Sequence, residues 1–251
     1  MNVAYLCDRG LNREENEDSI LVDEVEKLFI VADGMGGHNK GAVASTIVVD
    51  EFRKTITFLE QEKLESFDEK GVKKALEKQL NLQVEKATKS IYAYASKNII
   101  DGTMGSTIVG LYKLPIFEKW VVFHLGDSRV YHLSDNTLTQ LTLDHLGSMT
   151  LNSVLSKAIG NFEAMPLELN YFNPKEGDLF LLCSDGISDY CHNDELLELA
   201  LKYRYSLPLM CQYLKGLIYE RGAKEGGPSM SDPIDVICKE AERSARMCYR
   251  A

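Results

Sequence analysis

Short runs of apolar residues, separated by turn-forming residues, occupy most of the chain outside four longer stretches, and they predict β-strands. The expected strands lie near residues 2–7, 19–25, 27–33, 104–114, 119–127, 129–134, 137–142, 166–172, 177–185 and 234–239. Some runs, such as LFIVA at 28–32, are apolar at every position. That pattern is typical of strands that are buried on both faces.

The four longer stretches repeat apolar residues every three or four positions and predict amphipathic helices. We expect these helices over about 40–59, 68–97, 194–204 and 207–221, with Gly222 as the C-cap of the last. Strands, a helix pair, strands, a second helix pair and a final strand do not give the alternation of a doubly wound parallel sheet. The order favours an α+β fold with two sheets packed face to face and a helix pair outside each.

Length and charge narrow the class of protein. The 251 residues fit one domain, because sandwiches of about 200–250 residues commonly fold as a unit. We expect residues 1–251 to form it, with a C-terminal tail from about 239. A net charge of −10 without a basic cluster disfavours nucleic acid and anionic membrane surfaces as partners. No apolar run approaches a membrane span or a leader segment, so we expect a cytoplasmic protein. We also expect a monomer.

The six cysteines form no C-x-x-C pair and no zinc-like spacing with histidine. They are Cys7, Cys183, Cys191, Cys211, Cys238 and Cys248. We expect reduced, mostly structural thiols, since Cys183 and Cys238 lie inside strand-like runs. Cys191, next to His192, is disfavoured as a nucleophile because adjacent residues on a strand point to opposite faces.

Three of the apolar runs end in an aspartate next to a glycine: Asp33-Gly34, Gly126-Asp127 and Asp185-Gly186. Each pair alone is a common hairpin signal. Two further acidic sites precede predicted strands: Glu17-Asp18 and Asp232. Carboxylates gathered at strand ends repel one another unless cations neutralise them. The joint pattern therefore predicts a site with oxygen ligands for Mg²⁺ or Mn²⁺.

Six segments resemble, in order, the motifs of the metal-dependent protein serine/threonine phosphatases of the type 2C family, especially its compact bacterial members. They are DRGLNREENEDS, FIVADGMGGHNKGAVAS, GTMGSTIVGLY, FHLGDSRVYHL, LFLLCSDGISD and SDPIDVI. The combination of GMGGH, GDSR and SDGISD in this order is a specific signal, and the match runs nearly end to end.

This resemblance implies a four-layer α-β-β-α sandwich of two mainly antiparallel sheets flanked by helix pairs. It places two Mg²⁺ or Mn²⁺ ions at one end, between the sheets, and a third, weaker ion beside them. The implied metal ligands are Glu17, Asp18, Asp33, Gly34, Asp127, Asp185 and Asp232. Asp33 would bridge both ions, whereas Glu17 and Asp18 would hold water around the ions or ligate directly. Asp127, with Asp185, matches the pair that holds the third ion.

The resemblance also assigns groups that touch the phosphate. Arg13 matches the phosphate-binding arginine, whose planar fork can hold two oxygens. His38 steers water or protonates the leaving group, or else has a capping or structural role at the following helix. We expect a structural role for His145. The residues expected to brace the surrounding loops are Ser128, Arg129, Ser184 and Asp189.

The chain departs from the family pattern at two places. Pro233 and Asp235 stand where the closing motif usually has asparagine and threonine. The motif match leaves the roles of Asp8 and Asp235 open, either at the metal site or in the surrounding structure. Proline removes a backbone donor next to Asp232, so the affinity of the second ion is the property expected to differ. The segment LGSMTLNSVLSK at 146–157 is shorter than the usual flap, which implies looser substrate selection or selection by a partner.

The sequence thus predicts an enzyme that hydrolyses phosphoserine and phosphothreonine in proteins with water activated by two metal ions. No covalent phosphoenzyme is required. Its partner would be a phosphoprotein, a kinase or a kinase target in signalling. The altered Asp232 loop and the short flap leave open a pseudophosphatase or metal-stabilised binding module. A two-metal nuclease or phosphodiesterase shares the chemistry, but the acidic balance argues against it.

Overall fold

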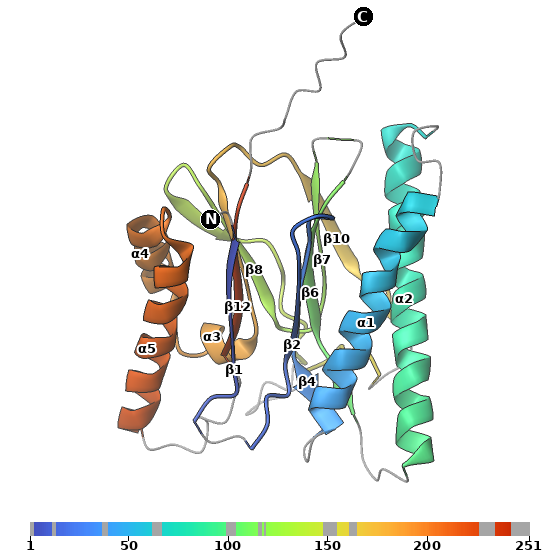
Figure 1. The fold of residues 1–251 in the computed structure, drawn as a ribbon, viewed down its shortest axis with the longest axis horizontal. Coiled ribbons are helices and arrows are strands. Elements are labelled where there is room, and N and C mark those ends of the chain that lie inside the picture. Colours follow the sequence, from blue (N-terminus) through green and yellow to red (C-terminus); the bar gives the residue numbers. More distant parts are fainter. Residues whose placement is uncertain are drawn as a thin grey trace, which may run out of the picture.

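Two five-stranded antiparallel sheets form the middle of the structure, a computed structural model (Figure 1). It describes residues 3–11, 14–36, 40–61, 67–98, 104–114, 117, 119–147, 155–160, 165–225 and 234–241, without the side chains of 55–61, 222–225, 234–235 and 240. In order, the first sheet comprises β1 (Val3–Asp8), β12 (Ile234–Glu240), β11 (Leu179–Cys183), β8 (Arg129–Ser134) and β9 (Thr137–Gln140). The second comprises β10 (Glu168–Phe172), β7 (Trp120–Leu125), β6 (Ile108–Lys113), β3 (Leu28–Ala32) and β2 (Ser19–Asp23).

A helix pair covers the outer face of each sheet (Figure 1). Helices α1 (Lys40–Gln61) and α2 (Glu69–Lys97) lie on the second sheet, and α4 (Asn193–Tyr203) and α5 (Leu207–Glu225) lie on the first. Helix α2 buries the predicted apolar positions: Val72, Leu76, Leu80, Val84, Ala87 and Ile91. Its N-cap is Asp68, whose carboxylate accepts the Gly71 amide at 2.8 Å.

The two sheets and the two helix pairs form four layers, and core side chains fill the three spaces between them. Phe29, Val109 and Phe180 pack between the two sheets. A second cluster, which includes Phe52 and Phe123, joins the second sheet to α1 and α2, and a third joins the first sheet to α4 and α5. The predicted α+β sandwich with a helix pair outside each sheet is therefore confirmed.

The structure differs from the sequence-based expectation at two element boundaries. Gly222 lies inside α5, which continues to Glu225, so its prediction as a C-cap was wrong. The predicted strand at 104–114 divides at Thr107 into β5 (Gly105–Ser106), which pairs with β4 (Gly34–Met35), and β6. None of the helices in the described ranges is both long enough and apolar enough to cross a membrane.

Candidate metal centre

The strand register brings acidic residues of the second sheet to one end of the sandwich. Ser19 of β2 pairs with Ala32 of β3, so Asp18 and Asp33 flank the same end of the two strands. Glu17 and Asp18 are each only 6% exposed, whereas Asp33 is half-buried. Strand pairing thus places two buried carboxylates next to a more accessible one.

The first sheet contributes acidic residues at the same end. Cys183 of β11 pairs with both Arg129 of β8 and Val236 of β12, so the end of β11 lies beside the starts of its neighbours. Asp185 begins α3 (Asp185–Ser188) directly after β11. Asp127 lies in the turn from β7 to β8, which connects the two sheets. In Figure 1 this end carries the labels of α3 and β4.

Gly34 occupies a cradle of backbone atoms that leaves no room for a side chain. A Cβ there would lie 2.0 Å from the Gly41 carbonyl oxygen and 2.4 Å from that of Glu17. Ser45 on α1 also donates a hydrogen bond to the Glu17 carbonyl at 2.7 Å. The first turns of α1 therefore pack directly against the backbone of Glu17 and Gly34, and only glycine permits this approach.

Thr107, which sequence reasoning did not single out, links the two sheets at this end. Its Oγ1 accepts the Asp33 amide at 3.0 Å, and its own amide donates to the Asp33 carbonyl at 2.8 Å. The same hydroxyl lies 2.7 Å from Ser128 Oγ, next to Asp127. A polar pair, Ser106-Thr107, inside an apolar run was the available signal. Thr107 fixes the backbone that carries Asp33.

Removing the Thr107 hydroxyl tests this link. Thr107→Val removes the hydrogen-bond partner of the half-buried Asp33 amide and of the buried Ser128 hydroxyl, so we expect a loss of about 1–3 kcal/mol in the free energy of unfolding for each orphaned group. Thr88→Val is the matched control, because Thr88 Oγ1 is buried on α2 without a hydrogen-bond partner among the described residues. Urea denaturation should show the control unchanged or more stable. Equal losses in both variants would contradict the role of Thr107.

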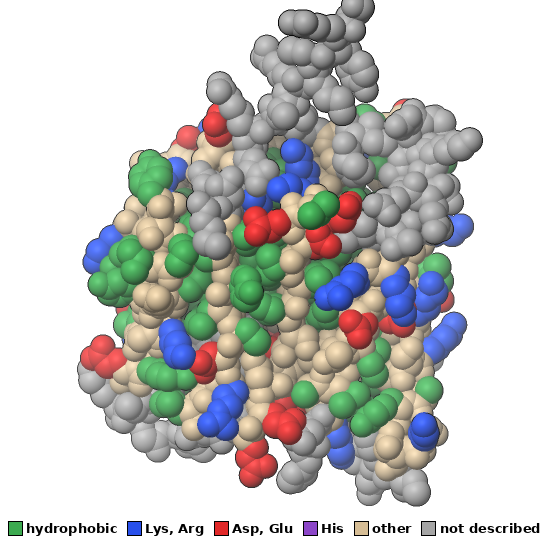
Figure 2. Space-filling model, viewed as in Figure 1, with side chains coloured by type: hydrophobic (Ala, Val, Ile, Leu, Met, Phe, Trp, Pro, Cys, Tyr) green, Lys and Arg blue, Asp and Glu red, His purple; other side chains and the backbone are tan. Residues whose placement is uncertain are grey.

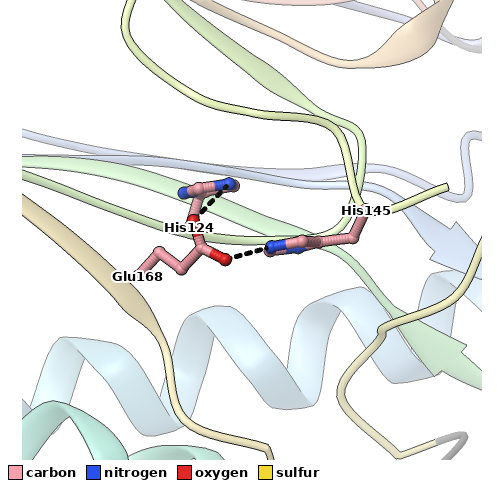
Figure 3. Close-up of side chains that lie close together, drawn as sticks. All are labelled: His124, His145 and Glu168. Atoms are coloured by element: carbon pink, nitrogen blue, oxygen red, sulfur yellow. Dashed lines mark hydrogen bonds and ion pairs between the residues drawn. The ribbon is translucent and has the colours of Figure 1, made fainter.

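His145 holds the backbone of Gly126, the residue before Asp127. Its Nδ1 accepts the Gly126 amide at 3.0 Å, and its own amide donates to the Gly126 carbonyl at 3.0 Å. Since Nδ1 accepts, Nε2 carries the proton and donates it to Glu168 Oε1 at 2.7 Å (Figure 3). The contacts of His145 are thus with the backbone of the turn and with Glu168, as a structural role requires.

His124 stacks on this ring, and the three side chains form a compact group (Figure 3). Atoms of His124, His145 and Glu168 lie within 4.8 Å of one another, close enough to suggest a metal site. Their hydrogen bonds argue against one, because both nitrogens of His145 are engaged and His124 Nε2 lies 3.0 Å from the Leu143 carbonyl. Burial lowers the pKa of His124, which favours the neutral form that metal ligation also needs, so the argument against a metal site here comes from the hydrogen bonds alone.

The carboxylates at the sheet ends have the donor chemistry that Mg²⁺ and Mn²⁺ prefer, namely oxygen atoms alone. No three of the predicted carboxylates in the described ranges form a group as compact as the histidine trio. Burial raises the pKa of Asp127, and the charges of Asp144 and Asp189 raise it further, so a cation would stabilise its ionised form. Ser184 Oγ, beside Asp185, is buried without a hydrogen-bond partner among the described residues. These residues fit a divalent cation.

Of the expected bracing residues, Arg129 and Asp189 make contacts of that kind and Ser128 meets Thr107, whereas the Ser184 hydroxyl has no hydrogen-bond partner among the described residues. Arg129 holds the Asp144 carboxylate with three hydrogen bonds of 2.6–3.1 Å. The Asp189 amide donates to the Asp185 carbonyl at 2.9 Å. Asp8 accepts Lys215 Nζ and Tyr219 Oη, both at 2.5 Å, which ties β1 to α5. Burial is the largest single influence on the pKa of Asp8 and raises it. The hydrogen bonds from Lys215 and Tyr219 are the main opposing influences, and the net result is a lowered pKa.

Four residues that the sequence assigns to the site or to its closing motif lie outside the described residues, as does Cys248: Arg13, His38, Asp232 and Pro233. Asp235 is described in its backbone alone, where it pairs with Cys7. Their assigned roles, and those of the described carboxylates as ligands, stay predictions.

Comparison with known proteins agrees with this geometry. The chain is 32% identical to the serine/threonine phosphatase stp of Listeria welshimeri over 51% of its length and 48% of that protein. It is 31% identical to the serine/threonine protein phosphatase PstP of Mycobacterium tuberculosis over 94% of its length and 44% of that protein. The chain thus spans about half the length of these relatives.

Solved structures and a family model extend the match. The crystal structure of Mycobacterium tuberculosis PstP/Ppp has a TM-score of 0.78 and 26% identity, covering 96% of this chain and 98% of that one. The catalytic domain of PstP, solved in complex with two manganese ions, has a TM-score of 0.75 and 25% identity, covering 96% and 98%. The model of the protein phosphatase 2C family matches residues 11–221. The chain belongs to the protein phosphatase 2C family.

Proposed function

We propose that this protein hydrolyses phosphoserine and phosphothreonine in proteins with the help of divalent metal ions. The observation that carries the proposal is the arrival of acidic residues from both sheets at one end of the sandwich. The backbone at Asp33 is fixed there by Thr107 and the first turns of α1. The family and the manganese-bound PstP domain support the same chemistry.

A backbone held in one position keeps the acidic side chains at this end of the sandwich where the proposed roles require them. Two divalent ions, when bound, lower the pKa of a water molecule and neutralise charge on phosphoryl oxygens. Asp33 and Gly34, with Asp185 and Asp232, would hold these ions, and the buried Glu17 and Asp18 would orient water or ligate directly. Arg13 would hold two phosphate oxygens through its fork. His38 would steer water or protonate the leaving group.

Hydrolysis of phosphopeptides tests the proposal. Purified protein with Mn²⁺ should release phosphate from phosphoserine and phosphothreonine peptides, and a chelator should stop the release. A phosphodiester should remain intact, since cleavage would indicate a nuclease or phosphodiesterase. Binding of a phosphopeptide with turnover no faster than in Asp33→Ala would instead indicate a pseudophosphatase or binding module.

Replacing Asp127 should reduce activity without removing it. Asp127 lies in the turn between the sheets and matches the ligand of a third, weaker ion, so Asp127→Ala should leave the two principal ions in place. We expect a loss of about 10–100-fold in kcat with metal-dependent activity retained. Titration of phosphate release against Mn²⁺ measures both quantities. Complete loss of metal-dependent activity would contradict a secondary position for this carboxylate.

We propose further that residues 1–251 act as one catalytic domain, in the cytoplasm and as a monomer. The substrate would be a kinase or the target of a kinase in a signalling pathway. The acidic net charge of −10 supports a protein substrate over a nucleic acid. Comparison of phosphoproteins between wild-type and deletion cells would identify the substrate, and no change in phosphoserine or phosphothreonine sites would argue against a signalling role.

A further inference from the structure

Two buried thiols face each other in the core beneath α5. Cys211 lies on α5 and Cys238 on β12, with their sulfur atoms 3.8 Å apart. Cys211 is 4% exposed, Cys238 is fully buried, and both are thiols. A disulfide bond of about 2.0 Å requires the sulfurs to approach by roughly 2 Å, a movement on the scale of side-chain rotation.

Cys211 also lines a surface pocket of about 460 Å³ between β1 and the first turns of α5. Its walls include Ala4, Leu6, Pro208, Gln212 and Lys215. Figure 2 shows hydrophobic side chains gathered over the strands on this face of the molecule. The pocket is many times larger than the roughly 30 Å³ that one water molecule occupies. A small polar reagent can therefore reach the wall formed by Cys211.

The two thiols differ in their readiness to ionise. The hydrogen bond between the two sulfur atoms, which either thiol can donate, lowers the pKa of Cys211 against burial, which raises it. The same hydrogen bond and complete burial raise the pKa of Cys238. In the same core, burial raises the pKa of Cys191 to about 11. Cys211 lines the pocket and Cys238 and Cys191 do not, so Cys211 is the favoured nucleophile of these three thiols, since the thiolate is the reactive form.

We propose that Cys211 and Cys238 form an oxidation site at which a peroxide produces an intrachain disulfide between α5 and β12. The Cys211 thiolate attacks a peroxide oxygen, the O–O bond breaks, and the leaving oxygen takes up a proton, which gives a sulfenic acid. The Cys238 thiol then attacks the sulfenic sulfur. An S–S bond forms, the S–O bond breaks, and water leaves with the thiol proton. Two thiols are oxidised, and one peroxide is reduced.

Both ends of this crosslink lie on elements that lead to the candidate metal centre. Strand β12 begins two residues after Asp232, and Lys215, one helical turn beyond Cys211, holds Asp8 at the end of β1. The disulfide would fasten α5 to β12. Its formation depends on the thiols alone, so its test is independent of the proposed phosphatase activity.

Peptide mapping of the oxidised protein tests the proposal. The folded 251-residue protein, reduced and then exposed to a small molar excess of hydrogen peroxide, should lose two hydrogen atoms in mass. A linked peptide containing Cys211 and Cys238 should appear, and dithiothreitol should reverse the linkage. Cys7→Ser removes an exposed thiol and should leave the linkage unchanged.

Two serine variants separate the pair from the rest of the core. Cys238→Ser should stop the reaction at the Cys211 sulfenic acid, which dimedone traps as a single adduct. Cys191→Ser, in the same core but outside the pair, should form the disulfide as wild type does. Absence of the linked peptide in folded wild-type protein, a linkage between other cysteines, or a wild-type protein that stops at sulfenic acid would each overturn the proposal.

Discussion

Asp33→Ala is expected to abolish metal-dependent phosphate release, with a loss of more than about 10³-fold in kcat. Removing a single hydrogen-bond donor from a charge-stabilising site already costs about 10²–10³-fold, and a carboxylate shared by two ions should contribute more. Asp33 follows the fully buried strand β3, and Thr107 fixes both its amide and its carbonyl. The backbone should therefore keep its position when the carboxylate is removed. Phosphopeptide hydrolysis at saturating Mn²⁺ measures the effect.

Asp50→Ala is the matched control, since Asp50 is an exposed residue of α1. It removes the same negative charge from the molecule, and alanine is a good helix former. The control should keep wild-type kcat and a wild-type unfolding midpoint. Equal rates for wild type and Asp33→Ala would refute the assignment of the bridging ligand.

Gly34→Ala is expected to disrupt both the fold and the metal centre. The added Cβ would lie 2.0 Å from the Gly41 carbonyl oxygen, far inside van der Waals contact, and the obstacle is backbone that cannot rotate away. We expect destabilisation at or above the upper end of the range of about 1–3 kcal/mol for overpacking. The first turns of α1 would have to move away from Glu17. Urea denaturation and Mn²⁺ titration should show lower stability and weaker metal binding together.

Gly216→Ala is expected to change stability in the opposite direction, which makes it a control within the same protein. Gly216 lies in the middle of α5, and a Cβ there meets no atom within 4 Å. Alanine is more favourable than glycine in a helix interior, so we expect a gain of about 0.5–1 kcal/mol and unchanged metal binding. A Gly34→Ala protein as stable as Gly216→Ala would show that the close backbone approach at Gly34 does not exist.

The layers of the fold could be predicted because each element carries its own pattern. Helix α2 buries the residues that its three- and four-residue spacing indicated, and β3 is buried along its whole length, as its unbroken apolar run suggested. Two helix pairs separated by strands then leave few ways to cover two sheets. The end of α5 was misjudged because Gly222 is a common stop signal that the continuing helix tolerates.

The contacts that shape the candidate site were not readable in the same way. Thr107 forms hydrogen bonds with Asp33, which is 74 residues away in the sequence, and with Ser128, which is 21 residues away. The spacing of residues within one segment does not predict such long-range contacts. The two hydrogen bonds between His145 and Gly126 likewise depend on strand register. The Asp-Gly pairs indicated where chain segments end, whereas hydrogen bonds between distant segments decide how firmly those ends are held.

Anomalous diffraction from a manganese-soaked crystal tests the central claim most directly. Two peaks roughly 3.5–4 Å apart should flank the Asp33 carboxylate, with Asp185 and Asp232 beside one of them. In Asp33→Ala crystals both peaks should weaken or vanish, while the histidine trio around His124 stays empty in either crystal. Manganese bound at that trio with nothing at Asp33, or no ordered manganese at all, would contradict the account.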